Sequence, residues 1–563
     1  MFHSIMMTNA RPSELTRCWL VRVSTRVPAA TLLSIILLST TCFGARQTAP
    51  NIVFILADDM GYGDSKPFGR ELCQIETPSM DRLAREGMRF TDAHAPNSVC
   101  VPTRMAIMTG RYAWRFGPPS PGGAWGFLGT RFPTTQFTLP KLLKPAGYQT
   151  AYIGKWHLGT KMVTVDGKVQ GIDNVDYTKP IETGPRQYGF DESFILPGSL
   201  DMYPYAFVRD QDWVGKVTAK KGWSAFNRVG PAAEDFEDTK VLDTFSSEAE
   251  SFLARQNKQP GRPFFLYLAL TAPHTPTSPS GAFEGKSRIG IYGDFVMEVD
   301  HCIGRVLTAL DEHDMADETI VIVTSDHGPA SYAGRRRKAT VNQLRELEDE
   351  GHFARGPFRG FKFSIYEGAF RVPFLVRWPG EVPASTSCQR LIGLHDLMGT
   401  LAEIIDRPLD DAQGPDSVSF LPLLLSPTAE APRKTMILQS VRAFAIRNAD
   451  WKLAFCPGSG CPGNYGNRPK QDDAWAAALV DFGRKPNRSE LLQNPFLQLF
   501  DLRSDVSESH NVAAANMKMV EKLHDPFRRT IDSGRTRPGP RLSNYRTSIP
   551  TFSSVPKSAK PSR

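Results

Sequence analysis

The chain has 563 residues, more than one hydrophobic core usually supports, so we expect two domains. Its formal net charge of +8 is carried by the ends: residues 1–44 contribute +3 and residues 533–563 contribute +7, which leaves −2 on the body of the chain. This distribution argues against a nucleic-acid-binding protein.

The N-terminal segment, residues 1–44, has the pattern of a cleaved export signal. Its arginines precede an apolar run at residues 29–38, which is too short to span a bilayer comfortably, and small residues follow. We therefore expect an exported protein, periplasmic or secreted, with no stable membrane span in the mature chain. Met6 and Met7 are alternative start residues because the charged region is long.

A short run of apolar and β-branched residues, Asn51–Leu56, predicts a buried strand near the start of the folded region. It leads directly into Asp58 and Asp59. Adjacent carboxylates at the end of an apolar strand repel each other unless a cation lies between them. A capped loop is the alternative interpretation of this pair taken alone.

The sequence Cys100-Val101-Pro102-Thr103-Arg104, followed by Met108-Thr109-Gly110-Arg111, is the most informative motif. Proline favours the first helical position and glycine suits a helix end, so Pro102–Thr109 is predicted as a two-turn helix. Cys100 then lies at the positive end of a helix dipole. Backbone N–H groups and Arg104 would there stabilise negative charge on a nucleophile and on the anionic group that it attacks. A structural cysteine beside an ordinary helix cap is the alternative.

Two further strand ends carry basic side chains. The predicted strand Thr150–Ile153 precedes Lys155 and His157, which alternation along an extended segment would point to the same side. The predicted strand Pro263–Leu270 precedes His274, which lies between two prolines. A single His or Lys is more often structural than catalytic.

A second carboxylate pattern follows the predicted strand Thr319–Thr324, which is succeeded by Asp326 and His327. If this strand end meets that of Asn51–Leu56, the carboxylates form an oxygen-rich cluster suited to a hard divalent cation, so Ca²⁺ is the leading candidate. His327 is a softer ligand, which leaves the identity of the metal more open than the existence of the site.

Two motifs follow. Arg335-Arg336-Arg337-Lys338 would either grip an anionic polymer near the mouth of the site or form a solvated charge run before the acidic helix 343–350. Next, Gly360-Phe361-Lys362 precedes the sequence Tyr366 to Pro373.

These segments, in this order, resemble the sulfatase family over residues 51–379, with a weaker echo at Leu499–Leu502, Asp505, Glu508 and Asn511. The chain departs from the usual family pattern at Thr103, where Ser is common, at His327, often Asn, and at Ala369, usually Gly. The resemblance implies an alkaline-phosphatase-like α/β fold, a doubly wound mixed sheet sandwiched by helices, and a smaller C-terminal α+β domain with a short antiparallel sheet. It implies sulfuric ester hydrolysis of the arylsulfatase type.

The resemblance also implies the chemistry. A formylglycine-generating enzyme would convert Cys100 to formylglycine before folding, and Asp58, Asp59, Asp326, His327 and the modified Cys100 would hold Ca²⁺, with Mg²⁺ a less favoured ion. Arg104, Lys155 and Lys362 would neutralise the sulfuryl oxygens. One hydroxyl of the hydrated aldehyde would attack sulfur while His274, with Lys362, protonates the departing alcohol. His157 would then deprotonate the second hydroxyl, and collapse to the aldehyde would expel sulfate.

The pattern divides the chain into a signal peptide (1–44), a catalytic domain (45–426), a C-terminal subdomain (427–532) and a basic, Ser/Pro-rich, disordered tail (533–563). Predicted helices include 80–87, 139–146, 239–255 and 295–312. Cys456 and Cys461 flank a turn and would form a disulfide in an oxidising compartment.

We expect a sulfated small molecule or glycan as substrate, with Tyr203, Tyr205 or Trp213 stacking on a sugar. The alternatives are a phosphatase or phosphonate monoester hydrolase of the same superfamily and an inactive glycan-binding relative.

Overall fold

The first apolar run of the chain forms β1 (Asn51–Asp58), an interior strand of a ten-stranded mixed sheet. The computed structural model describes residues 49–222, 228–334, 343–441, 443–456, 458–460 and 497–545. In spatial order the strands of this sheet are β13 (Thr386–Cys388), β2 (Met88–Phe90), β12 (Phe374–Arg377), β11 (Thr319–Ser325), β1, β10 (Phe264–Pro273), β4 (Gln149–Lys155), β5 (Glu192–Leu196), β6 (Val208–Arg209) and β7 (Asp212–Trp213).

The centre of the sheet is parallel and its margins are mixed. β1 pairs in parallel with both β10 and β11, and β4 pairs in parallel with β10 and β5. β12 runs antiparallel to β11 and to β2. The carboxyl ends of β11, β1, β10 and β4 therefore meet at one edge of the sheet.

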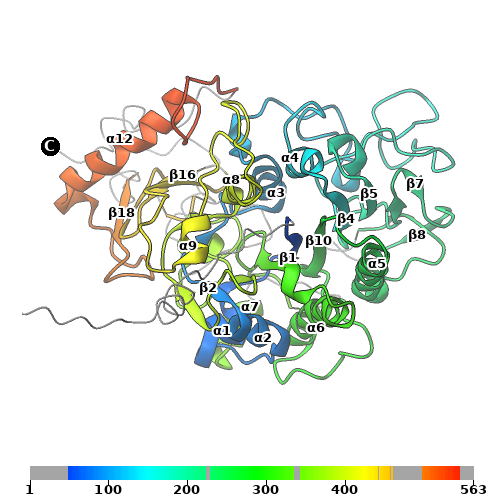
Figure 1. The fold of residues 1–563 in the computed structure, drawn as a ribbon, viewed down its shortest axis with the longest axis horizontal. Helices are drawn as coiled ribbons and strands as arrows, with labels where there is room; N and C mark the ends of the chain where they lie inside the picture. Colours follow the sequence, from blue (N-terminus) through cyan, green and yellow to red (C-terminus); the bar gives the residue numbers. More distant parts are fainter. Residues whose placement is uncertain are drawn as a thin grey trace, which may run out of the picture. The chain divides into compact units, whose positions relative to one another are not determined.

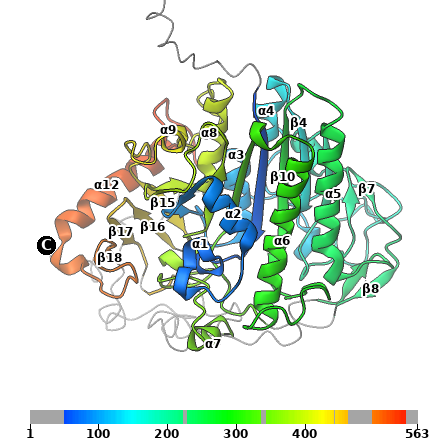
Figure 2. The same cartoon turned by 60° about the horizontal axis from the view of Figure 1, so that its bottom comes forward.

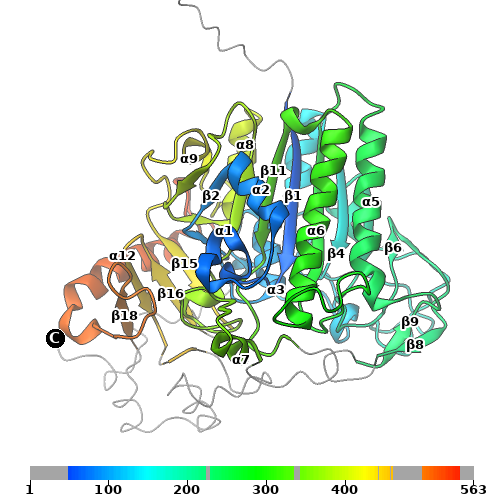
Figure 3. The ribbon, with the colours of Figure 1, turned by 90° about the horizontal axis from the view of Figure 1, so that it is seen from below.

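Alternate residues of β1 point into two separate apolar cores, as expected for a strand covered on both faces. Val53, Ile55 and Ala57 pack in the core shared with α5 (Val241–Gln256) and α6 (Ile291–Glu312). Ile52, Phe54 and Leu56 pack in the core on the opposite face. Residues of α3 (Cys100–Thr109), α4 (Leu139–Leu143) and α8 (Leu397–Ile404) complete this second core. Figure 3 shows α5 and α6 side by side in front of the strands.

The remaining helices are short, except for the last one, which has 17 residues. They are α1 (Lys66–Gly69), α2 (Pro78–Glu86), α3 (Cys100–Thr109), α4 (Leu139–Leu143), α7 (Gln343–Asp349), α8 (Leu397–Ile404), α9 (Leu421–Leu425) and α12 (Met517–Ser533). None of the helices in the part of the chain described combines the length and apolar character needed to cross a bilayer.

A four-stranded antiparallel sheet follows, in the order β15 (Met436–Gln439), β16 (Phe444–Arg447), β17 (Trp451–Ala454) and β18 (Gln498–Asp501). α12 packs on it, with Phe527 stacked on Phe455, and Figure 1 shows this sheet and helix together. Two-stranded pairings join β3 (Ala93–His94) to β14 (Ile392–Gly393), and β8 (Ala219–Lys221) to β9 (Gly230–Ala232). The predicted fold class, a mixed sheet between helices plus a short antiparallel sheet, is confirmed.

The predicted helices all exist, with shifted ends. α3 begins at Cys100, two residues before the predicted start at Pro102, because proline is tolerated throughout the first turn, where no backbone N–H is needed. Gly110 ends it with φ of 60°, in the left-handed region that glycine adopts without strain.

The prediction of a disordered tail is wrong for its first residues. Residues 534–545 contact the body of the protein, where Arg115, which is 1% exposed, donates to Asp416 and to Asn544 Oδ1 at 2.6 Å. Thr536 Oγ1 also donates to Asp416 Oδ1, at 2.9 Å. A buried arginine needs acceptors, and the tail supplies one of them; composition alone does not reveal this.

The other tail residues, the signal segment, the Arg335–Lys338 run and Cys461 lie outside the described residues, and the predictions made on them stay predictions. The predicted boundary at residue 427 lies between α9 and β15, and residues 48–563 cluster as one unit.

Candidate active site

The carboxyl ends of the four central parallel strands bring the predicted acidic and basic residues together. β1 ends at Asp58, β11 at Ser325 just before Asp326, β10 at Pro273 just before His274, and β4 at Lys155. In Figure 2 the adjacent strands β1 and β10 run in the same direction, which is why residues 97 to 267 positions apart in sequence reach one place.

Cys100 lies at the start of α3 and is 3% exposed. Its Sγ atom is 3.2 Å from His327 Nε2, 3.4 Å from Lys362 Nζ and 3.8 Å from Asp59 Oδ1. Burial raises the pKa of the Cys100 thiol well above its ordinary value, although Lys362 and Lys155 oppose this. The unmodified thiol is therefore neutral at neutral pH and is a poor nucleophile.

Arg104, one turn further along α3, joins two strand ends. Its Nε donates to Asp326 Oδ2 at 3.1 Å, and its Nη2 donates to Asp58 Oδ1 at 3.2 Å. Thr103 uses its hydroxyl differently, donating to the carbonyl of Asn97 at 2.8 Å. The Thr103 hydroxyl thus fixes the segment that leads into α3.

Asp58 and Asp59 face different cations. Asp58 Oδ2 accepts from Lys155 Nζ at 2.5 Å, whereas both oxygens of Asp59 accept from Lys362 Nζ at 2.8 Å. Burial alone would raise both pKa values, but the neighbouring cations together outweigh it, so the pKa of each carboxyl is lowered. Lys155 contributes most of the opposing effect at Asp58, and Lys362 at Asp59. Both are ionised at neutral pH. Asp59 has φ of 62°, a strained backbone that turns its side chain away from that of Asp58.

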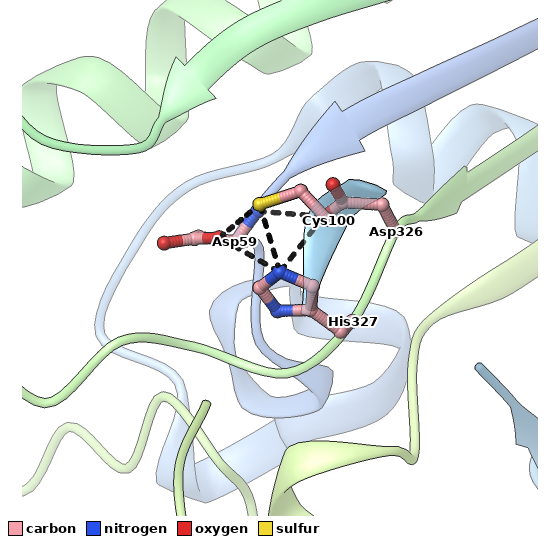
Figure 4. A group of neighbouring side chains, drawn as sticks. All are labelled: Asp59, Cys100, Asp326 and His327. Carbon is pink, nitrogen blue, oxygen red and sulfur yellow. Dashed lines mark hydrogen bonds and ion pairs between the residues drawn. The ribbon is translucent and has the colours of Figure 1, made fainter. Parts of the chain in front are cut away.

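Four buried side chains have the arrangement of a metal site. One ligand atom from each of Asp59, Cys100, Asp326 and His327 lies within 4.8 Å of the others, and Figure 4 shows these side chains gathered around one point. Two carboxylates and an imidazole are ligands that divalent cations accept. The residues present therefore fit a metal ion. Asp58, also predicted as a ligand, lies outside this group with its oxygens held by Lys155 and Arg104.

His274 and His157 approach the group from β10 and β4. His274 Nδ1 bonds the carbonyl of Thr275 at 2.6 Å, so Nε2 is the atom that faces the site, 3.7 Å from Asp59 Oδ2. Burial, Lys155 and Arg104 together lower the pKa of His157 well below its ordinary value.

The predicted alternation of Lys155 and His157 is wrong in detail. β4 ends at Lys155, and His157 has φ of 53°, so the backbone turns between them. His157 nevertheless remains near Lys155 and Arg104, as their effect on its pKa shows. The turn, and not strand alternation, brings it there.

Sequence reasoning missed Asp201. Its Oδ1 lies 3.9 Å from His274 Nδ1, and its Oδ2 pairs with Arg228 Nη1 at 3.1 Å. It follows no strand end and has no motif, so the sequence carries no signal for it. Of the predicted stacking aromatics, Tyr205 is wrong: it is 1% exposed and donates to the carbonyl of Arg228, so no sugar reaches its face.

A mixed sheet whose central strand ends hold these charged groups around a cysteine in the first turn of a helix defines the alkaline-phosphatase-like class of hydrolases. The family model for sulfatases matches residues 50–406, so the chain belongs to the sulfatase family and is a sulfuric ester hydrolase.

Three relatives show how far the likeness extends. The chain is 30% identical over 532 residues to the N-acetylgalactosamine-6-O-sulfatase of Bacteroides thetaiotaomicron, covering 88% of this chain and 94% of the relative. It is 31% identical over 457 residues to the mouse steryl-sulfatase, covering 71% and 69%. A solved sulfatase structure from the glycosaminoglycan metabolism of Bacteroides thetaiotaomicron superposes with a TM-score of 0.70 at 28% identity, covering 86% of this chain and 99% of that one.

Proposed function

We propose that this sulfatase hydrolyses a sulfate ester of a sugar or polysaccharide, with a 6-O-sulfated N-acetylgalactosamine as the first substrate to test. The observation that carries the sulfate ester is the set of three buried cations, Arg104, Lys155 and Lys362, around Cys100. A sulfate ester is an anion, and three fixed positive groups neutralise its sulfuryl oxygens and the negative charge that moves within the group in the transition state.

Cys100 is the proposed site of formylglycine formation, since it starts α3 in the Cys-Val-Pro-Thr-Arg motif and its unmodified thiol, buried and neutral, is a poor nucleophile. When formed, the hydrated aldehyde supplies a hydroxyl nucleophile and a route to release sulfate by reversal to the aldehyde. A formylglycine-generating enzyme is then a necessary partner during maturation.

The histidines are assigned by the atoms they present. His274 donates its Nδ1 proton to the carbonyl of Thr275, so a second proton on the ring lies on Nε2. From this imidazolium form Nε2 delivers its proton to the departing alcohol oxygen, and the ring is left neutral. His157 is neutral because its pKa is lowered, so it is suited to accept a proton. Lys362 lies beside Cys100 and Asp59, and we assign it to help His274 protonate the departing alcohol.

Asp58, Asp59, Asp326, His327 and the modified Cys100 are the proposed ligands of one Ca²⁺. A bound divalent cation supplies Lewis-acid stabilisation of the sulfuryl oxygens. Ca²⁺ is favoured over Mg²⁺ because it tolerates irregular, carboxylate-rich coordination, whereas Mg²⁺ demands a near-ideal octahedron.

The sugar class rests on the Bacteroides thetaiotaomicron relative, which is matched over 88% of this chain and 94% of its own length and whose name specifies an N-acetylgalactosamine-6-O-sulfatase. The steryl-sulfatase match covers less of both chains, which ranks a steroid sulfate second. Export to the periplasm or medium, proposed from residues 1–44, suits an extracellular glycan.

The test is a substrate panel. Protein produced with a formylglycine-generating enzyme is incubated with sulfated monosaccharides, sulfated glycan oligosaccharides, a steryl sulfate and matched phosphate and phosphonate monoesters. Release of sulfate from a 6-O-sulfated N-acetylgalactosamine at the highest kcat/KM supports the proposal. Faster turnover of the phosphorus esters would replace it with a phosphatase, and binding without turnover by a formylglycine-containing preparation would leave a glycan-binding protein.

A further inference from the structure

The loop that follows β18, residues 502–512, is fixed by two of its own side chains. Asp505 accepts from the backbone N–H groups of Ser509 at 2.9 Å and His510 at 2.8 Å. Asn511 accepts from Leu499 N and donates to Leu497 O, both at 3.0 Å, which pins the loop to the strand. Between these anchors Glu508 turns inward with φ of 52° and is fully buried. A strained, buried acidic residue held this firmly calls for an explanation.

Glu508 contacts both ends of the segment that carries Lys362, residues 359–368, which we call the lysine segment. Arg359 Nη1 donates to the backbone carbonyl of Glu508 at 2.9 Å, and the backbone N–H of Glu367 donates to Glu508 Oε2 at 2.5 Å. Gly368 N donates to Arg359 O at 2.7 Å, which closes the segment into a loop. One residue more than 140 positions downstream therefore grips the lysine segment before and after Lys362.

Inside the lysine segment the position of Lys362 has little freedom. Lys362 N donates to Pro329 O at 2.8 Å, and Phe363 N donates to Ser98 O at 3.0 Å, two residues before Cys100. Phe363 has φ of 78°, so the backbone turns sharply beside the lysine. A displacement of the loop would therefore move Lys362 Nζ relative to Asp59 and Cys100.

Glu508 also belongs to a buried ionic cluster that is complete without a metal. Its Oε1 is 2.9 Å from Lys452 Nζ, and Lys452 is in turn 3.2 Å from Glu367. Glu367 is held by Arg447 at 2.6 Å and Arg371 at 3.0 Å. Asp92, His94 and Glu367 have the spacing of metal ligands, but these arginines already occupy the carboxylates.

We propose that Glu508 is a positioning residue for the sulfatase reaction: it holds the lysine segment so that Lys362 Nζ stays between Asp59 and Cys100. This inference rests on the proposed function, since Lys362 acts there on the reacting group. A purely structural role, joining the C-terminal sheet to the larger sheet, is the competing explanation.

Two substitutions separate the explanations. Glu508→Gln keeps the length of the side chain and an oxygen acceptor for Glu367 N, and loses the ion pair with Lys452. Burial raises the pKa of Glu508 to about 7, so the carboxyl is only partly ionised near neutral pH. Its oxygen accepts the hydrogen bond from Glu367 N in either protonation state. Glu508→Asp keeps the charge and withdraws the acceptor by one methylene. We expect Glu508→Gln to lower the melting temperature with kcat within about threefold of wild type, and Glu508→Asp to lower kcat roughly ten- to a hundredfold, as for a reacting group misplaced by about 1 Å.

The matched control is Asp92→Asn, which weakens the same cluster through Arg447 without touching Glu508. If Glu508 had only a structural role, its effect on kcat would follow the loss of stability. Asp92→Asn and Glu508→Asp variants with the same melting temperature would then have the same kcat. A double-mutant cycle gives the sharper readout: in a Lys362→Ala background, Glu508→Asp should lower the residual kcat little further. The proposal would be overturned if Lys362→Ala and Glu508→Asp lowered kcat by independent factors that multiply in the double variant. It would also be overturned if Glu508→Asp alone left kcat unchanged.

A second readout does not need turnover. Acylation of Lys362 by an amine-reactive reagent, followed by peptide mass spectrometry, should be faster in Glu508→Asp than in Asp92→Asn or the wild type, because a loosened segment exposes the amine. If the wild type hydrolysed no sulfate ester, the proposed function would fail while this measurement still decided the role of Glu508. Equal acylation rates in the three proteins would count against it.

Discussion

Lys362 Nζ donates to both carboxylate oxygens of Asp59, each at 2.8 Å, although 303 residues separate the two in the chain. Burial lowers the pKa of Lys362, but the surrounding acidic groups, Asp59 foremost, together outweigh it and raise the pKa well above its ordinary value, so the ammonium stays charged. The lysine therefore compensates Asp59 and competes electrostatically with any cation bound there.

Replacing this lysine should change the response to calcium. In Lys362→Met, Asp59 loses its main compensating charge, so Ca²⁺ should bind more tightly and raise the melting temperature by more than it does in the wild type. Thermal unfolding with a calcium titration after chelator treatment measures this. A smaller shift in the variant would mean that Lys362 does not oppose the ion, and activity is expected to fall in either case.

Cys100 should carry the proposed modification. The peptide that contains it should weigh about 18 Da less than the thiol form when the protein is made with a formylglycine-generating enzyme, from conversion of the thiol to an aldehyde. Cys100→Ala should fold, with unchanged melting behaviour within a few degrees, and should lack activity. Full activity in that variant would exclude the proposed nucleophile.

His274 and Lys155 should differ in their dependence on the leaving group. His274→Ala should impair turnover of sugar sulfates far more than that of nitrophenyl sulfate, because a nitrophenolate departs without a proton. Lys155→Ala is the matched comparison, since its charge acts on the sulfuryl oxygens and should depress both substrates by similar factors. Equal losses on both substrates in His274→Ala would assign that residue to binding alone.

Glu298 should make stability depend on pH. Burial raises its pKa to about 7, above the 4.5 of the ordinary group, so the folded state favours the protonated form; its contribution is present below pH 4.5 and is lost as pH rises to 7. Glu298→Gln can still accept from Ser280 N and does not titrate. The difference in the free energy of unfolding between this variant and the wild type should therefore be more favourable to the variant at pH 8 than at pH 5, by up to about 3 kcal/mol. Denaturant unfolding at the two pH values tests it. The exposed Glu312→Gln, in the same helix, serves as the control.

The contacts of residues 534–545 can be tested by truncation. Removing residues 546–563 keeps the contacts of Arg115 and Asp416 with Asn544 and Thr536, so the melting temperature should hold. Removing residues 534–563 takes away the Asn544 and Thr536 partners and should cost roughly 1–3 kcal/mol, the range for leaving buried polar groups unsatisfied. Equal melting temperatures for the two truncations would show that these contacts add no stability.

The sequence predicts the parts of the site that depend on strand direction. Asp58, Asp326, His274 and Lys155 each follow or end an apolar run, and parallel strands bring such ends together whatever the details of the loops. The helix at Cys100 was predictable for a similar reason, since proline and glycine have strong local preferences.

The remaining features depend on contacts made at long range. Nothing local shows that Asp201 approaches His274, that Glu508 reaches the lysine segment, or that the tail supplies acceptors to Arg115. The turn at His157 was missed because a left-handed backbone at a non-glycine residue is imposed by its surroundings and leaves no pattern in the sequence.

The burial of Cys100 also sets an order of events during synthesis. The walls that enclose its sulfur include Lys362, which leaves the ribosome 262 residues later. At a translation rate of about 5–20 residues per second, roughly 10–50 s pass between the two. Throughout that interval the site lacks one of its walls, and the proposed converting enzyme would reach the cysteine on a growing chain. A full-length chain that folds before it meets this enzyme would enclose the thiol, and later exposure to the enzyme would act only on molecules that unfold again.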